Sequence, residues 1–130
     1  MKVAVIGGKG YIGKHLVYYL QQMGITAQVY DVQDDKEQNY KKIDITNSDS
    51  VSEMDLNVDY IFMFAGLTGT YAGFDKYQMY NAINEIGLLN ILNAIRNSEY
   101  RPKVIFPSTR LVYKGCDKPL KETDEKETKT

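Results

Sequence analysis

VAVIGGKGYIGKHL, residues 3–16, joins a short apolar run to a glycine-rich turn and the start of a helix. The opening run VAVI is typical of a strand that is covered on both faces in a parallel sheet. After the turn, apolar residues recur at helical spacing through Met23, and Gly24 is well placed to end the helix in a left-handed conformation. These residues therefore predict a strand that turns directly into a helix.

The rest of the chain alternates in the same way. Four more strands are predicted, within ITAQVYD (25–31), NYKKIDIT (39–46), DYIFMFAG (59–66) and KVIFPST (103–109). SDSVSEM (48–54) predicts a short helix at most, and residues 76–96 predict a long helix that is apolar almost all round. Strands that alternate with helices predict right-handed βαβ units and a doubly wound parallel sheet.

Length, composition and charge limit the function classes. The 130 residues are 43% hydrophobic and 25% charged, as expected of one soluble domain with a core. Lys plus Arg (16) nearly balances Asp plus Glu (17), which removes the bulk electrostatic argument for nucleic acid or an anionic membrane. No apolar run approaches the roughly 20 residues of a membrane span. Cys116 is the only cysteine, so no internal disulfide can form and a cytoplasmic location is predicted.

Three glycines in the turn point to a phosphate ligand. Free backbone N–H groups and the helix dipole at the start of the helix attract an anion. Gly7 permits the tight turn, Gly10 lets a diphosphate approach the backbone, and Gly13 lets the helix lie close to the strand. The older G-x-G-x-x-G template also fits, through Gly8. The alternative is a strand-to-helix turn without a ligand.

Asp31 ends the second predicted strand, 18 residues after Gly13. A carboxylate at that place accepts hydrogen bonds from the ribose hydroxyls of a dinucleotide and repels the 2′-phosphate of NADP, which favours NAD. Residues 32–35 include no arginine to hold that phosphate, and Lys36 is only a weak candidate. The alternative is that Asp31 merely suits a turn.

Several segments together resemble the extended short-chain dehydrogenases, the NAD-dependent epimerase/dehydratase family, and most of all the nucleotide-sugar 4-epimerases. The segments are VIGGKGYIGKHL (5–16), DIT (44–46), FAGL (64–67), NEIGLLNILNA (84–94) and FPSTRLVYKG (106–115). They occur in the family's order along essentially the whole chain. The expected fold is a Rossmann-type sheet with strand order 3-2-1-4-5, formed by residues 1–113 and followed by a charged loop or tail at 114–130.

The resemblance implies a set of cofactor-binding residues. Asp44 and Ile45 match the pair that flanks the adenine, although an ordinary strand end is the alternative. Ala65, Gly66 and Leu67 match a segment that runs beside the dinucleotide. The implied cofactor-binding residues are Gly7, Gly10, Tyr11, Ile12, Gly13, Asp31, Asp44, Ile45, Ala65, Gly66 and Leu67.

Two catalytic residues are also implied by the resemblance. Thr109, four residues before Tyr113, matches the family's catalytic hydroxyl, with Ser108 as the runner-up. Asn84 matches an asparagine that faces the active site, unless it is only a polar position of the long helix. Thr68 stands where the 4-epimerases usually have lysine, which leaves the substrate class open. Arg110 replaces the small residue that commonly follows the catalytic hydroxyl.

One element of the family pattern is absent from the printed sequence. Family members use a tyrosine whose pKa is lowered by a lysine four residues later, and no lysine here has a tyrosine four positions before it. We expect an N-terminal part of a longer enzyme that oxidises a nucleotide sugar with NAD, inactive alone and prone to form a homodimer or larger assembly. The alternative is a self-contained NAD-binding or regulatory module.

Overall fold

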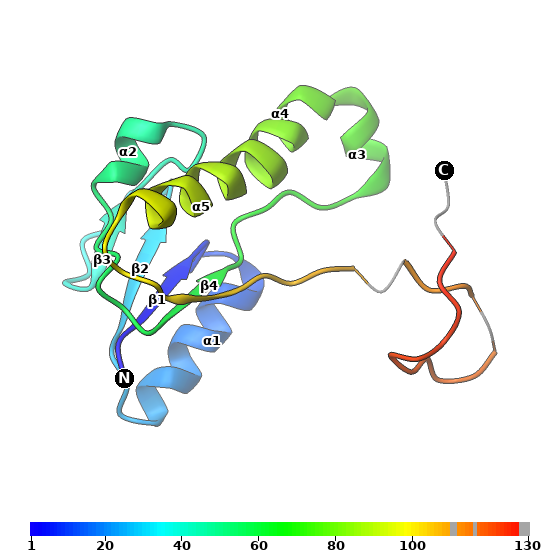
Figure 1. Cartoon of the computed structure of the whole chain (residues 1–130), viewed down its shortest axis with the longest axis horizontal. Coiled ribbons are helices and arrows are strands. Elements are labelled where there is room, and N and C mark those ends of the chain that lie inside the picture. Colours follow the sequence, from blue (N-terminus) through cyan, green and yellow to red (C-terminus); the bar gives the residue numbers. More distant parts are fainter. Residues whose placement is uncertain (110–111, 116, 128–130) are drawn as a thin grey trace.

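Five parallel strands form one sheet in the order β3-β2-β1-β4-β5, as predicted. The computed structural model (Figure 1) describes residues 1–109, 112–115 and 117–127. The strands are β1 (Val3–Ile6), β2 (Ala27–Asp31), β3 (Tyr40–Lys42), β4 (Tyr60–Met63) and β5 (Lys103–Ile105). In the register of the central strand, Val3 lies opposite Ala27 on β2 and Tyr60 on β4. The strand order reverses between β1 and β4, the position where such sheets bind ligands.

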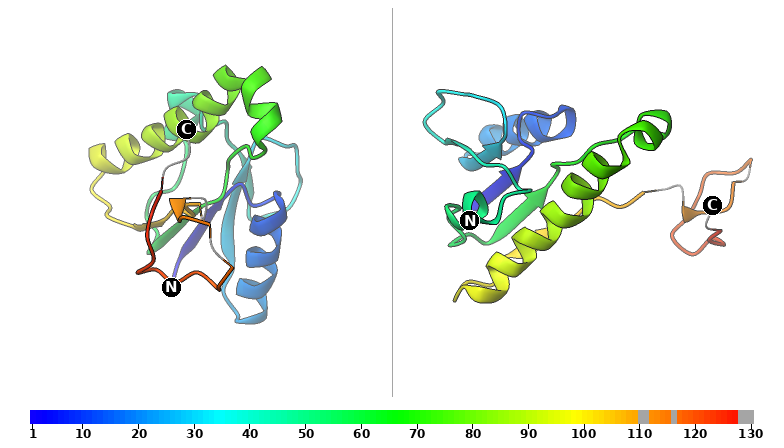
Figure 2. Two further views of the ribbon diagram at one scale, coloured as in Figure 1. Left: turned by 90° about the vertical axis from the view of Figure 1, so that its right-hand side faces the viewer. Right: turned by 90° about the horizontal axis from the view of Figure 1, so that it is seen from above.

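Helices cover both faces of this sheet. The helical elements are α1 (Tyr11–Gln22), α2 (Ser48–Ser52), α3 (Thr70–Asp75), α4 (Tyr77–Asn81), the π-helical η1 (Ala82–Ile86) and α5 (Gly87–Asn97). Figure 2 shows α1 on one face and α2 with α5 on the other. α1 is followed by Gly24 with a φ of 73°, so the predicted left-handed helix end is confirmed.

The core has two parts because side chains of β1 alternate between the two faces. Val3 and Val5 pack with Leu20 of α1, whereas Ala4 and Ile6 belong to a larger cluster on the opposite face. That cluster contains Val51 of α2 together with Ile91 and Ile95 of α5. All four residues of β1 are buried, which confirms the prediction of a strand covered on both sides.

The long helix differs from its prediction in two ways. Helical structure runs from Tyr77 to Asn97, close to the predicted 76–96, but residues Ala82–Ile86 are π-helical. In addition, a separate helix, α3, precedes it and turns at Lys76, where φ is −120°. The apolar pattern did not predict either feature, because neither changes which residue types occur along the helix.

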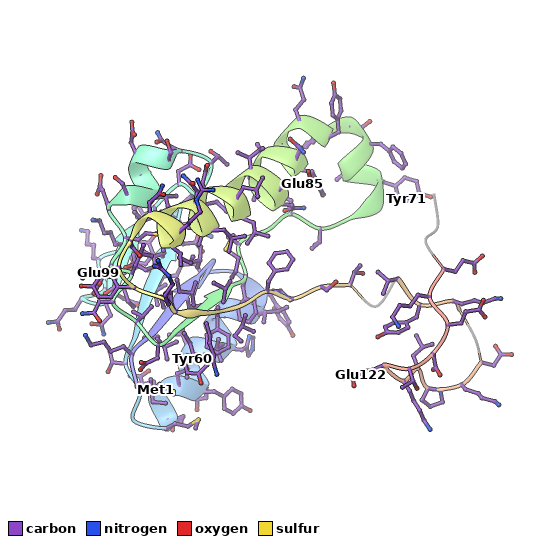
Figure 3. The ribbon with its side chains drawn as sticks, viewed as in Figure 1. Met1, Tyr60, Tyr71, Glu85, Glu99 and Glu122 are labelled. Atoms are coloured by element: carbon purple, nitrogen blue, oxygen red, sulfur yellow. The ribbon has the colours of Figure 1, made fainter. Side chains whose placement is uncertain are left out.

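The C-terminal segment, described at residues 112–115 and 117–127, lies apart from the sheet (Figures 1 and 3). Tyr113 and Lys126 form an isolated antiparallel bridge, and the ammonium group of Lys114 lies 3.3 Å from a carboxylate oxygen of Glu125. Figure 3 labels Glu122 within this segment. Arg110 and Cys116, for which the sequence made predictions, lie outside the described residues. In the part of the chain that the structure describes, no helix is long and apolar enough to cross a membrane.

Candidate cofactor-binding site

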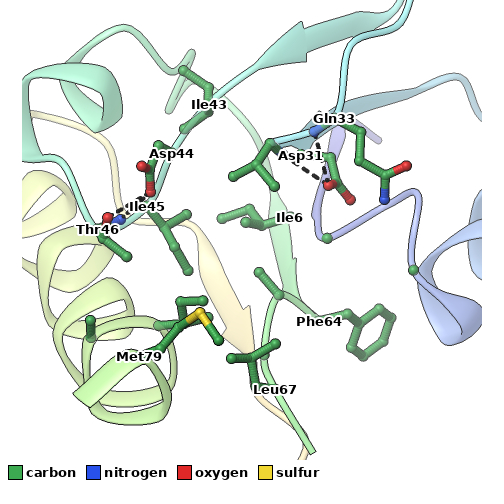
Figure 4. A pocket seen from close by; sticks show the side chains of 17 residues that line it. Ile6, Asp31, Gln33, Ile43, Asp44, Ile45, Thr46, Phe64, Leu67 and Met79 are labelled. Carbon is green, nitrogen blue, oxygen red and sulfur yellow. Dashed lines mark hydrogen bonds between the residues drawn. The ribbon is translucent and has the colours of Figure 1, made fainter. Parts of the chain in front are cut away.

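A cavity of about 610 Å³ opens at the carboxyl ends of the strands (Figure 4). Loops that follow β1, β2, β3 and β4 border it, and residues from α4 and η1 close one side. The structure brings eight of the predicted cofactor-binding residues to its wall: Gly7, Gly10, Asp31, Asp44, Ile45, Ala65, Gly66 and Leu67. Tyr11, Ile12, Gly13, Asn84 and Thr109 are not among the residues that line it.

Gly7 and Gly13 have the steric roles that the sequence predicts for them. Gly7 has a φ of 80°, and a Cβ there would lie 2.4 Å from the backbone nitrogen of Ala65. A Cβ on Gly13 would lie 2.2 Å from the carbonyl oxygen of Gly7. Gly8 differs, since its Cβ would meet a side-chain methyl carbon of Val29 at 2.5 Å and no backbone atom closer than 3.5 Å. The backbone of the turn therefore packs too closely for a side chain at Gly7 and at Gly13.

Gly10 has a different environment from its neighbours. It has an ordinary φ of −69°, and a Cβ there would meet only the carbonyl oxygen of Gly7, at 3.2 Å. Gly10 lines the cavity and precedes α1, which has no side-chain cap. The side chains of Tyr11 and Ile12 are exposed to solvent. These two residues contribute their backbone N–H groups to the N-terminus of α1. This uncapped N-terminus attracts a negative charge.

The carboxylate of Asp31 is fixed by three backbone groups at the edge of the cavity. One oxygen accepts a hydrogen bond from the N–H of Lys9 at 2.9 Å, and the other accepts from the N–H of Val32 at 2.8 Å and from that of Gln33 at 3.5 Å. Asp31 thereby joins the end of β2 to the glycine-rich turn. Figure 4 shows its side chain next to that turn.

An ion-pair cluster that sequence reasoning missed lies beside Asp31. The ammonium group of Lys9 contacts the carboxylate of Asp35 and lies 2.9 Å from that of Glu37. It also lies 5.4 Å from the ring centroid of Tyr40, whose hydroxyl donates to the carbonyl oxygen of Asp31 at 2.9 Å. The hydrogen bond between Lys9 and Asp35 raises the pKa of Lys9 and lowers that of Asp35. The run of acidic residues after Asp31 in the sequence was the signal that could have revealed this cluster.

Asp44 and Ile45 form the part of the wall that follows β3. A carboxylate oxygen of Asp44 accepts from the N–H and the hydroxyl of Thr46, at 2.9 and 2.7 Å. Ile45 is buried, and its carbonyl oxygen accepts from the side-chain amide of Asn90 on α5 at 2.8 Å. Asn90 therefore holds this loop, a role that the sequence analysis did not assign to it.

Asn84 holds the loop that follows β4. Its side-chain oxygen accepts from the N–H of Leu67 at 2.7 Å, and its amide nitrogen donates to the carbonyl oxygen of the same residue at 2.9 Å. Asn84 lies in η1, and π-helical segments are frequent at functional sites. Both polar ends of the side chain are thus directed at the cavity wall rather than at the cavity itself.

Thr109 lies four residues beyond the end of β5, in the segment that leads away from the sheet. Its neighbour Arg110 lies outside the described residues. The assignment of Thr109 as the catalytic hydroxyl, with Ser108 as the alternative, therefore stays a prediction.

Known proteins match both the sequence and the fold. The model of the NAD dependent epimerase/dehydratase family matches residues 3–130. A UDP-glucose 4-epimerase of Mycoplasma genitalium is 26% identical over 125 residues, which cover 86% of this chain and 37% of that protein. A sterol-4-alpha-carboxylate 3-dehydrogenase of Mus musculus is 24% identical over 119 residues, 89% of this chain and 32% of that protein.

Among solved structures, a UDP-glucose-4-epimerase of Stenotrophomonas maltophila with bound NAD and formylated UDP-arabinopyranose superposes with a TM-score of 0.83. It is 24% identical, and the match covers all of this chain and 44% of that one. The chain thus spans between 32% and 44% of the length of these three proteins. Because the family model matches almost every residue, the chain belongs to the NAD-dependent epimerase/dehydratase family.

Proposed function

We propose that the chain binds NAD and is the cofactor-binding part of an enzyme that oxidises a hydroxyl of a nucleotide sugar. The observation that carries the proposal is the cavity at the strand-order switch, bordered by both the glycine-rich turn and the carboxylate of Asp31. The similarity to an NAD-bound epimerase supports it. We place the chain in the cytoplasm because its single cysteine suits a reducing compartment.

In this proposal each border of the cavity recognises one part of the dinucleotide. The diphosphate lies over Gly10 and accepts hydrogen bonds from backbone N–H groups at the start of α1, which include those of Tyr11, Ile12 and Gly13. The adenosine ribose donates its hydroxyl hydrogens to Asp31. The adenine lies against Asp44 and Ile45, and the segment from Ala65 to Leu67 runs beside the rest of the cofactor.

The chemistry proposed for the longer enzyme is removal of hydrogen from a sugar carbinol. When bound, NAD would accept a hydride from the carbinol carbon, while a base would take the hydroxyl proton. Thr109 would hydrogen-bond the reacting oxygen, with Ser108 as the alternative, and Asn84 would position the loop at Leu67. The 130 residues contain no tyrosine four positions before a lysine. We therefore propose that residues 1–113 bind the cofactor, that 114–130 form a connecting segment, and that this stretch alone does not turn over.

Titration of the chain with NAD tests the binding proposal, and Gly10→Ala is the informative variant. The added methyl group would lie 3.2 Å from the carbonyl oxygen of Gly7, which must shift by a few tenths of an ångström, and in the proposal it projects where the diphosphate would approach. We expect the dissociation constant for NAD to rise about tenfold or more, because a lost close contact and its hydrogen bonds weaken binding by about 1.4 kcal/mol or more. Thermal unfolding of the variant is measured alongside, so that a loss of binding is read only from a folded chain.

Gly115→Ala is the matched control, since a Cβ there meets nothing within 4 Å and lies in the C-terminal segment. A wild-type chain without measurable affinity for NAD, or equal affinity in Gly10→Ala, would contradict the proposed site. An assay with a UDP-sugar and NAD should show no turnover, and measurable turnover would contradict the proposal that this stretch is inactive alone.

A further inference from the structure

The cluster of Lys9, Asp35, Glu37 and Tyr40 lies beside Asp31, the residue that would meet a ribose at the cavity wall. The backbone N–H of Lys9 donates to the carboxylate of Asp31, while its ammonium group is held by Asp35 and Glu37. The Lys9 side chain is 20% exposed, and that of Asp35 is 25% exposed. The cation is therefore already paired with two carboxylates, and it lies 5.4 Å from the ring centroid of Tyr40, whose hydroxyl donates to the carbonyl oxygen of Asp31.

We propose that Asp35 and Glu37 are specificity-determining residues that keep the Lys9 cation away from the 2′-phosphate of NADP. The inference rests on the proposed function, since it assumes that the ribose lies at Asp31. A 2′-phosphate brings negative charge next to the carboxylate of Asp31 and is tolerated only where a nearby cation compensates it. Lys9 is the cation whose own backbone contacts Asp31, and its charge is already balanced by the two acidic residues.

Two other lysines lie near this edge, and the structure separates them from Lys9. Lys42 pairs with Asp34 at 2.8 Å and lies on β3 opposite Asp31 in the strand register. Lys36 follows Asp35 in the loop and makes no ion pair among the described residues. Neither donates a hydrogen bond to Asp31 among the described residues, whereas Lys9 does. Lys36 therefore serves as a comparison residue in the test.

The double variant Asp35→Asn with Glu37→Gln tests the proposal directly. It removes two charges but keeps the shape of both side chains, so the Lys9 ammonium becomes available to a phosphate. Calorimetric titration at low ionic strength, where exposed charges are little screened, should show NADP bound about tenfold more tightly than by the wild type. Affinity for NAD should change by about twofold or less, because NAD has no phosphate at that position.

Three further variants identify the cause of any gain. Adding Lys9→Ala to the double variant should abolish the gain, whereas adding Lys36→Ala should leave it in place. Asp34→Asn alone, which removes a nearby charge that is not paired with Lys9, should leave the ratio of NADP to NAD affinity unchanged. Circular dichroism melting of each variant confirms that it is folded before it is titrated.

The outcomes separate this inference from the proposed function. Wild-type binding of NAD with no gain in NADP affinity in the folded double variant would overturn the inference and leave the NAD site standing. A gain that survives Lys9→Ala would also overturn it, because simple removal of negative charge would then explain the effect. No binding of NAD by the wild type would contradict the proposed function and this inference together.

Discussion

In the proposed NAD site, the side chain of Asp31 serves the fold and the ligand at once. Each of its carboxylate oxygens has two lone-pair sites. One oxygen accepts from the N–H of Lys9, and the other accepts from the N–H of Val32 and, at 3.5 Å, from that of Gln33. In the proposed site, the second lone-pair site of the oxygen bonded to Lys9 accepts from a ribose hydroxyl. The backbone contacts also fix the orientation of the carboxylate before a ligand binds, which reduces the entropy lost on binding.

Asp31→Ala should therefore weaken NAD binding by about tenfold or more and NADP binding much less. The physical reason is the loss of charge-assisted hydrogen bonds, each worth about 1.5–3 kcal/mol at a desolvated site. For NADP this loss is offset, because the variant also removes the repulsion between the carboxylate and the 2′-phosphate. Titration of the variant with both cofactors measures the two effects. Asp34→Ala is the control, because Asp34 pairs with Lys42 instead of lying on the cavity wall. Equal losses for both cofactors would remove Asp31 from the ribose position.

At the scale of elements, the long helical run links two separate loops of the cavity wall. Its residues Asn84 and Asn90 hold Leu67 and Ile45 through side-chain to backbone hydrogen bonds. Gly87 lies between them and packs closely on the loop that follows β3, since a Cβ there would lie 2.5 Å from a methyl carbon of Ile45. The helix therefore positions the wall as well as covering the sheet.

Gly87→Ala should lower the free energy of unfolding by about 1 kcal/mol. Overpacking against buried Ile45 costs about 1–3 kcal/mol, and the better helix propensity of alanine offsets about 1 kcal/mol of it. Urea unfolding measures the difference. Gly73→Ala in α3 is the matched control, because its Cβ would meet Tyr80 at an ordinary 3.6 Å and so should leave stability equal or higher. A stabilised Gly87→Ala chain would show that α5 can move away from the loop.

At the scale of the whole molecule, the helical run also carries exposed apolar side chains. Met79 and Ile86 are 44% and 43% exposed, and Leu89 is 58% exposed. Tyr71 and Phe74 of α3 are exposed as well. We propose that exposed apolar side chains of this helical run and of α3 form the surface through which the chain self-associates, because large exposed apolar patches mark interaction surfaces.

Leu89→Glu should shift the chain from a self-associated form towards a monomer in light scattering at matched concentration. The substitution removes the burial of the leucine side chain at the contact, worth about 1.5–3 kcal/mol. It also adds the cost of desolvating a carboxylate. Asn93→Glu adds the same charge one helical turn away at an exposed polar position and should have little effect. A wild-type chain that is already monomeric would contradict the prediction.

The sequence predicted the architecture better than the details of the site. The parallel sheet and the steric roles of Gly7 and Gly13 followed from patterns of residue type, since burial and close packing limit which residues can occur there, and the strand order followed from the resemblance to the family. The π-helical turn did not follow, because the sequence around Asn84 remains apolar and helical in either form. The pairing of Lys9 with Asp35 was also missed, since it depends on how a loop folds back and not on any spacing along the chain.

The two asparagine contacts restrict how the chain can change in length. Asn84 and Asn90 are six residues apart, roughly 9 Å along a helix axis at about 1.5 Å per residue. An insertion or deletion between them would turn one asparagine about 100° around the axis and release its loop. Surface loops accept added residues more readily than helices and strands do. The helical stretch between Asn84 and Asn90 should instead tolerate substitutions at its exposed positions. It should not tolerate the insertion or deletion of a single residue between the two contacts.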